Sequence, residues 1–179
     1  MLTKILIAVA VVLVVFLIAV AFQPNHFRVE RSIVVAAPAA VPFGHVNDLQ
    51  KWNAINPWAK LDPAMKSTYG GPPSGVGASH TWAGNGEVGE GMMTIIDSRP
   101  SDLIRMRLDF KKPFASTATA EYTFRSQGAG TEVRWSLSGA KNFISKAFGL
   151  VMNVDKMVGD QFEKGLADLK AISEAGAGK

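Results

Sequence analysis

Three consecutive segments alternate between apolar and polar side chains, and this alternation constrains the fold more than any other feature. In residues 103–110 the apolar side chains share one face and the charged ones share the other, and residues 116–126 and 131–139 repeat the pattern. A strand with one dry and one wet face is typical of an antiparallel sheet that is covered on a single side. The glycine-rich residues 127–130 predict a hairpin turn between the last two strands.

Shorter elements precede these strands. Residues 27–36 alternate and are rich in β-branched side chains, which predicts a first strand. We expect a short helix over residues 40–49, followed by an aromatic helix or turn at residues 52–58 that a proline interrupts. Residues 79–83 and 91–98 predict two further strands, separated by tight turns because this part of the chain is rich in glycine.

The C-terminal part of the chain predicts a long helix. No proline interrupts residues 143–174. A break is expected near residues 153–155, and residues 175–179 are expected to fray. Strands followed by a helix indicate an α+β fold in which a curved sheet packs on the long helix and encloses an apolar space. The apolar residues of the predicted helix stripe, at steps near three and four, are Phe148, Val151, Val158, Phe162, Leu166, Leu169 and Ile172.

The N-terminal residues form a separate segment. Residues 5–22 carry no charged side chain, and a helix of this length spans about 27 Å, close to the ~30 Å hydrocarbon thickness of a bilayer. Two interpretations stay open: an uncleaved single-pass transmembrane anchor, or a signal-like segment cleaved after the small-x-small residues 19–21. The length favours the anchor. We therefore expect residues 1–24 to form the anchor and residues 25–179 to form one ligand-binding domain.

The charges beside this apolar segment barely decide its orientation, because Lys4 lies on one side while Arg28 and Arg31 lie on the other. The arrangement we expect is a cytoplasmic N-terminus in the cell membrane and a domain exported to the periplasmic side.

Composition and spacing exclude several kinds of site. The chain has no cysteine, which removes disulfides, thiolate nucleophiles and cysteine-based zinc sites. The net charge of +4 is spread without a basic run, so no nucleic-acid partner is expected. His26, His45 and His80 lie far apart and lack a metal-ligand spacing, so we expect no metal and interpret each as a surface or rim residue. Residues 84–89 have the glycine spacing of a dinucleotide loop, but a strand follows them, which indicates a hairpin and no cofactor.

Short motifs accompany this order of elements, at residues 31–38, 48–52, 75–78, 82–85, 89–94, 120–124, 130–133 and 162–166. In these motifs and in the order of its elements, the chain resembles the SRPBCC superfamily over roughly residues 27–174. This superfamily has the START-like helix-grip fold and is also described as polyketide cyclase/dehydrase. Several bacterial members also have an N-terminal hydrophobic segment. The resemblance implies a helix-grip domain after one transmembrane helix, with a cavity for a hydrophobic small molecule between the sheet and the C-terminal helix. It implies no particular reaction and transfers no catalytic residue.

Aromatic and methionine side chains of the expected interior are the candidate ligand-binding residues. For any one of them the alternative is a filled core. As a set they favour a ligand site, because such sites are mostly apolar with a few polar anchors, here His80, Tyr122 and Trp135. The candidates are Trp52, Trp58, His80, Trp82, Met93, Met106, Phe110, Tyr122, Phe124, Trp135, Phe148 and Met152.

Three functions are compatible with these features. The leading hypothesis is membrane-tethered binding or transport of a lipid, isoprenoid or polyketide-like molecule. The second is a polyketide cyclase/aromatase-like enzyme, less expected because it needs a buried ionisable group that faces the cavity. The third is an accessory subunit of a larger membrane complex, with residues 143–152 as the docking face for a membrane-protein partner. The candidate acid/base carboxylates are Glu87, Glu90, Asp97, Asp109 and Glu121, and the last two lie on wet strand faces.

Overall fold

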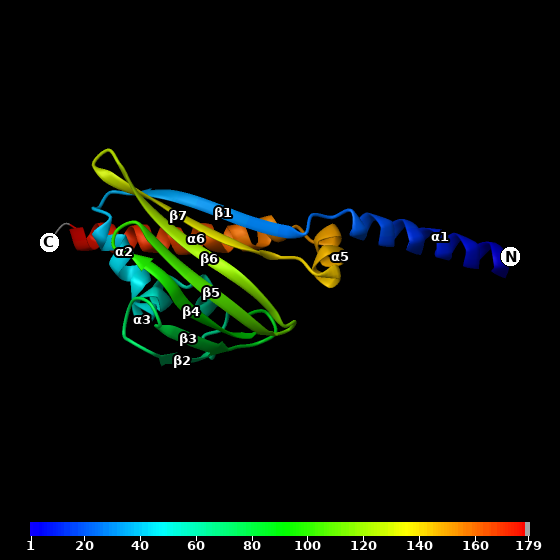
Figure 1. The fold of residues 1–179 in the computed structure, drawn as a ribbon, viewed down its shortest axis with the longest axis horizontal. Coiled ribbons are helices and arrows are strands. Elements are labelled where there is room, and N and C mark those ends of the chain that lie inside the picture. The colour runs from blue at the N-terminus through cyan, green and yellow to red at the C-terminus, as the bar shows by residue number, and fades with distance from the viewer. Residues whose placement is uncertain (178–179) are drawn as a thin grey trace.

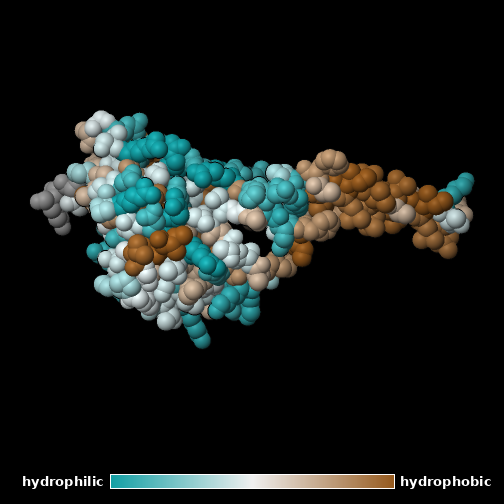
Figure 2. Space-filling model, viewed as in Figure 1, coloured by the Kyte–Doolittle hydropathy of each residue, from teal (hydrophilic) through white to brown (hydrophobic). Residues whose placement is uncertain are grey.

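The computed structural model describes residues 1–177, in which one helix projects from the end of a folded domain (Figure 1). This helix, α1 (Leu2–Ala21), is exposed along its length, and among its residues only Val20 is buried. Its surface is continuously hydrophobic (Figure 2). Helix α1 is long and apolar enough to cross a membrane, although a signal sequence near an N-terminus has the same properties.

Within the described residues, seven antiparallel strands form one sheet. Their spatial order is β1-β7-β6-β5-β4-β3-β2, so that β2 to β7 follow one another as neighbours and β1 lies beside β7. The predicted strands are confirmed, and their ends differ by no more than one or two residues. The strands are β1 (His26–Val35), β2 (Lys66–Gly70), β3 (Ser79–Ala83), β4 (Glu90–Arg99), β5 (Leu103–Lys112), β6 (Ser116–Gln127) and β7 (Gly130–Ala140).

The interior face of the sheet follows the predicted alternation. In β6, Ala118, Ala120, Tyr122 and Phe124 are buried, while the residues between them are not. Strand β2 is absent from the sequence prediction. It is an edge strand, exposed throughout and paired only with β3. Because neither of its faces is buried, it has no apolar alternation that would reveal it.

Three short helices and one 3-10 turn cover the other side of the interior. They are α2 (Ala40–Asn47), α3 (Leu49–Trp52), η1 (Asn53–Ile55) and α4 (Pro57–Leu61). The helix predicted over residues 40–49 is divided at Asp48, whose carboxylate accepts hydrogen bonds from two backbone N–H groups of α3. Asn56 caps α4 in the same way, with Pro57 in the first turn, where a missing N–H costs nothing.

The C-terminal segment contains two helices, α5 (Phe143–Val151) and α6 (Val154–Ala177). The predicted break between them is confirmed, and the Asn153 side chain caps α6 by accepting a hydrogen bond from the Lys156 N–H at 2.9 Å. Because of this break, the prediction that Phe148 and Val151 lie on one apolar stripe with the α6 residues was wrong; both are exposed on α5. Residues 175–177 continue α6 and do not fray, and residues 178–179 lie outside the described residues.

Helix α6 packs along β1 and α2 and buries Phe162, Leu166 and Leu169 against the interior of the sheet. An ion-pair cluster holds its first half to β1. The Arg31 guanidinium lies 3.0 Å from carboxylate oxygens of both Asp155 and Glu163. A side chain at position 159, where α6 has glycine, would overlap this guanidinium. The fold therefore fixes α6 over the sheet. The space beneath α6 can hold protein side chains or a ligand.

Candidate ligand-binding cavity

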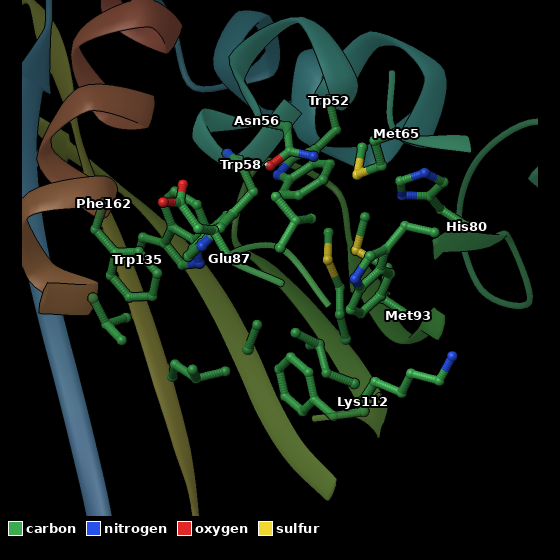
Figure 3. A pocket seen from close by; sticks show the side chains of 18 of the residues that line it. Trp52, Asn56, Trp58, Met65, His80, Glu87, Met93, Lys112, Trp135 and Phe162 are labelled. Atoms are coloured by element: carbon green, nitrogen blue, oxygen red, sulfur yellow. Dashed lines mark hydrogen bonds between the residues drawn. The ribbon is translucent and has the colours of Figure 1, made fainter. Parts of the chain in front are cut away.

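A cavity of about 270 Å³ lies beneath α6, between the interior face of the sheet and the short helices (Figure 3). Its size is close to the lower end of the range for small-molecule sites. Most of its lining is apolar, and the polar groups are few. Figure 3 shows Phe162 entering from α6, Trp52 and Trp58 from the short helices, and Trp135 from the sheet.

Most of the predicted site residues meet in this cavity. Strands far apart in the sheet contribute to it, from β3 to β7, because the sheet is curved (Figure 1). Contact with a ligand stays a prediction for each of them. The predicted residues that line the cavity are Trp52, Trp58, His80, Trp82, Met93, Met106, Phe110, Tyr122 and Trp135.

Three predicted residues lie elsewhere. Phe124 points to the interior, but its ring packs edge-on against Phe43, with ring centres 5.6 Å apart, so it belongs to filled core. Phe148 and Met152 are exposed, because the break before α6 places them on or beside α5, outside the space under α6. Their assignment to the space under the long helix was therefore wrong.

Further lining residues come from two sources. Five of them lie on faces that the sequence already predicted to be apolar, although they were not among the candidate ligand-binding residues. They are Leu108, Ala120 and Leu137 on the alternating strands and Val158 and Phe162 on the predicted helix stripe. The others come from turns, from the short helices and from the last residue of β5, where no periodic pattern marks the inward side. These are Asn56, Met65, Glu87, Val88, Lys112 and Pro113.

Stacked aromatic rings form one wall of the cavity. The Trp135 ring lies between Tyr122, at 4.9 Å, and Phe162, at 4.0 Å, with interplanar angles of 22° and 13°. Trp52 and Trp58 meet the same indole edge-on. Because each ring restrains its neighbours and aromatic side chains have few rotatable bonds, this wall is a preformed apolar surface.

The buried hydroxyl of Tyr122 accepts a hydrogen bond from Trp52 Nε1 at 3.0 Å. Burial raises the pKa of the Tyr122 phenol well above its ordinary value, so this group is neutral at physiological pH. The pair therefore joins the short helices to the sheet without placing a charge in the cavity.

His80 lines the cavity, where it was placed as a candidate anchor, and it is 1% exposed, so its interpretation as a surface or rim residue was wrong. Its Nε2 lies 3.0 Å from the Ser67 hydroxyl of β2, and its ring stacks on Tyr69 with centres 4.8 Å apart. Burial lowers the pKa of His80 to about 4, because a charged imidazolium would lose its hydration there. The imidazole is consequently neutral near pH 7.

Two buried nitrogen atoms of the lining have no hydrogen-bond partner within residues 1–177: Nδ1 of His80 and Nε1 of Trp135. An unpartnered buried polar atom costs free energy. The indole nitrogen is a donor only, whereas the role of the imidazole nitrogen depends on its tautomer. A ligand with a carbonyl or hydroxyl oxygen is complementary to the indole donor.

The candidate carboxylates lie outside the cavity or at its rim. Glu87 is exposed at the rim, and Glu90 accepts a hydrogen bond from Lys112 Nζ at 2.7 Å. Asp97, Asp109 and Glu121 form ion pairs with arginines on the outer side of the sheet. Among the described residues, no group of three or more histidine, aspartate or glutamate side chains is arranged to hold a metal ion.

Residues 26–174 match the sequence profile of the family described as polyketide cyclase / dehydrase and lipid transport. No curated protein sequence matches the chain. Solved structures with the same fold include protein CV1439 from Chromobacterium violaceum, with a TM-score of 0.59 and 14% identity over 85% of this chain and 99% of that one.

Ara h 8.0201 is similar with a TM-score of 0.56 and 11% identity, over 82% of this chain and 99% of that one. The di-domain ARO/CYC BexL of the BE-7585A biosynthetic pathway is similar with a TM-score of 0.61 and 13% identity, over 87% of this chain and 52% of that one. At these identities the likeness shows the fold. The predicted helix-grip fold, with its sheet wrapped around a long C-terminal helix, is confirmed.

Proposed function

We propose that this chain, which belongs to the polyketide cyclase/dehydrase and lipid transport family, binds a hydrophobic small molecule beneath α6 and exchanges it with the membrane to which α1 tethers the domain. The family and its cyclase relatives support a role in hydrophobic-ligand binding or cyclisation. Membrane tethering and exchange of the ligand are the further steps of this proposal.

The observation that carries the proposal is the preformed apolar cavity with two unpartnered nitrogen atoms. A cavity of about 270 Å³ suits an isoprenoid, polyketide-like or single-chain lipid portion better than a whole two-chain lipid. The indole Nε1–H of Trp135 would donate to an oxygen of the ligand, and His80 would accept from or donate to a second polar group. The expected ligand is therefore largely hydrocarbon with one or two oxygen atoms.

The tether is the second part of the proposal. Helix α1 is 20 residues long, longer than the apolar region of a usual signal peptide, and this length supports an uncleaved single-pass anchor. A tether of this kind raises the local concentration of the domain at the bilayer, where a water-insoluble ligand is dissolved. We place the domain on the exported side of the membrane.

The rim of the cavity lies at the end of the sheet nearest α1. Pro113 of the rim precedes β6, whose Ala118 pairs with Gly139 at the end of β7. The same end of β7 pairs with the start of β1, through His26 and Ala140, directly after the chain leaves α1. We therefore expect an apolar ligand to enter and leave by this end of the cavity, which is the end of the sheet from which α1 leaves.

Ligand retention tests the proposal. The full chain would be purified in a mild detergent, and bound molecules would be released by denaturation and identified by mass spectrometry. Ala120→Phe places a ring in the cavity and is expected to lower retention roughly tenfold or more, whereas Ala129→Phe on the exposed β6–β7 turn should retain the ligand. A wild-type chain that carries no apolar molecule, and takes up none from a lipid extract, would refute the proposal.

A cyclase-like activity is the second candidate, and the buried His80 favours it. In an intramolecular aldol closure, Nδ1 of the neutral imidazole would accept the proton from a carbon between two carbonyl groups of a poly-β-ketone. That carbon would form a bond to a distant carbonyl carbon of the same chain, and the carbonyl oxygen would take the proton back from the imidazolium as it becomes a hydroxyl group. Because burial lowers the pKa of His80 to about 4, the imidazole is a weak base, and for this reason we place binding first. Conversion of a linear poly-β-keto thioester by the wild type, lost in His80→Gln with ligand retention unchanged, would establish the enzyme.

A further inference from the structure

Helix α5 exposes apolar side chains that no part of the described structure covers. None of its residues is buried, and Val151 is 80% exposed. Phe143, Ile144 and Phe148 are also exposed, as is Met152 directly after the helix. A contiguous apolar patch of this kind on a soluble domain marks an interaction surface.

The apolar residues of α5 occupy one side of the helix. At 100° per residue, Phe143, Ile144, Ala147, Phe148, Leu150 and Val151 fall within one arc of about 160°, and Ser145, Lys146 and Gly149 fall on the opposite side. A polar face that contains lysine, opposite a broad apolar face with aromatic residues, is the pattern of a helix that lies in the interface of a membrane.

The position of α5 relative to α1 fits the same arrangement. Helix α5 contacts α1, and its axis runs across the direction of α1 (Figure 1). The backbone N–H of Lys141, just before α5, donates a hydrogen bond to the Asn25 carbonyl, just after α1, at 2.7 Å. If α1 crosses a bilayer, α5 is held at the level where α1 leaves it and lies roughly in the plane of the membrane.

The charges near α5 also suit a lipid surface. Residues 140–154 contain lysines at 141 and 146 and no acidic residue. Lysine side chains at this depth extend to the head groups and attract anionic lipids. The hydrophobic surface of α1 continues onto the adjoining end of the domain (Figure 2). Continuity with the anchor and the absence of acidic residues favour a bilayer over a protein partner as the occupant of this face.

We infer that α5 is an interfacial helix that lies in the head-group layer of the bilayer spanned by α1, with its apolar arc turned towards the acyl chains. This inference rests on the proposed membrane tether. The exposed Phe114, at the β5–β6 turn, belongs to the same end of the sheet and provides a second apolar contact with the bilayer. With α1, α5 and this turn in contact with the membrane, the domain has a defined orientation and its cavity rim stays beside the lipid.

The chain contains no cysteine, so single cysteines can be placed and spin-labelled without altering other thiols. The full chain would be reconstituted in vesicles of phosphatidylcholine and phosphatidylglycerol. Collision of the label with oxygen, which concentrates in lipid, would be compared with collision with a water-soluble nickel chelate. The positions are Val151→Cys on the apolar arc, Ser145→Cys on the opposite face, Gln127→Cys at the end of β6 beside the distant β6–β7 turn, and Val12→Cys in α1.

We expect Val151→Cys to resemble Val12→Cys, with high oxygen collision and a severalfold loss of nickel collision relative to Gln127→Cys; Ser145→Cys should resemble Gln127→Cys. Nickel collision at Val151→Cys equal to that at Gln127→Cys would place α5 in water and overturn the inference while the anchor stands. Shielding of Val151→Cys from both reagents would indicate a protein contact and also overturn it. Nickel collision at Val12→Cys would instead refute the membrane tether.

Discussion

Replacement of His80 by glutamine is expected to remove much of the acid sensitivity of this fold. His80 is buried and neutral, and its pKa is lowered to about 4 from an ordinary value of 6.5 because burial disfavours the charged imidazolium. The unfolded chain exposes the same imidazole to water. Between these two pKa values the unfolded chain therefore binds a proton that the folded chain does not.

The sign and size of the effect follow from these values. The full contribution of neutral His80 is present above pH 6.5 and is lost as the pH falls from 6.5 towards 4, where the folded form also becomes protonated. The difference of 2.5 in pKa, at about 1.36 kcal/mol for each unit, corresponds to about 3 kcal/mol of unfolding free energy. The groups that face the ring carry no charge in this range; they are Ser67, Tyr69, Trp52 and Trp82.

Urea denaturation of the full chain in detergent micelles, followed by tryptophan fluorescence, measures this effect. When the pH is lowered from roughly 7 to 4.5, the unfolding free energy of the wild type should fall by about 2 kcal/mol more than that of His80→Gln. Ser67→Ala is the matched control, because it removes the hydrogen bond and keeps the buried imidazole, so its loss over this range should equal that of the wild type. His45, whose pKa is lowered by partial burial and by Lys51, contributes to acid sensitivity in the same direction.

The reasoning would be refuted if His80→Gln and the wild type lost equal stability on acidification. It would also be refuted if an NMR titration of the folded chain gave the His80 imidazole its ordinary pKa, because the side chain would then be hydrated and not part of a dry cavity.

Three further substitutions probe the cavity wall. Tyr122→Phe leaves the buried Trp52 N–H without an acceptor, so the unfolding free energy measured in urea should fall by about 1–3 kcal/mol, and an unchanged value would contradict the hydrogen bond. Gly165→Ala would place its Cβ 2.9 Å from the Trp135 ring and should cost about 1–3 kcal/mol in the same assay, whereas Gly176→Ala, with nothing within 4 Å, should cost nothing; equal effects would be inconsistent with the packing. Trp135→Phe retains an aromatic ring but removes the Nε1 donor. Competition binding should show that the affinity for an oxygen-bearing ligand falls roughly tenfold while the affinity for a pure hydrocarbon does not change; an equal loss for both ligands would mean that the nitrogen does not anchor the ligand.

The extent to which the fold was predictable differs between elements. Strands β4 to β7 were predicted correctly because each buries one face, and burial of every second residue produces an alternation of apolar and polar residues in the sequence. Strand β2 was not found, because an exposed edge strand is held by its hydrogen bonds to β3 and needs no apolar residue. Helix α5 was joined to α6 in one stripe because its apolar residues have the same period, although they face away from the core.

The candidate site shows the same division. Tyr122 and Trp135 were predicted from the sequence as large side chains on the dry faces of their strands, and Trp52 as an aromatic residue of a helix or turn; all three line the cavity. Phe124 has the same pattern yet lies in filled core beside Phe43. Sequence periodicity reports which face of a strand is dry, but it does not report whether the space on that face is filled by another side chain.

The sequence by itself therefore determined the order and type of most elements, the dry face of each long strand, and the separate apolar character of α1, because these properties depend on residues that are close together in the chain. The tertiary structure alone decided that His80 is buried and neutral, that Trp135 stacks between Tyr122 and Phe162, and that a cavity remains beneath α6. These properties depend on the curvature of the sheet and on the position of α6, which bring together residues that are far apart in the chain.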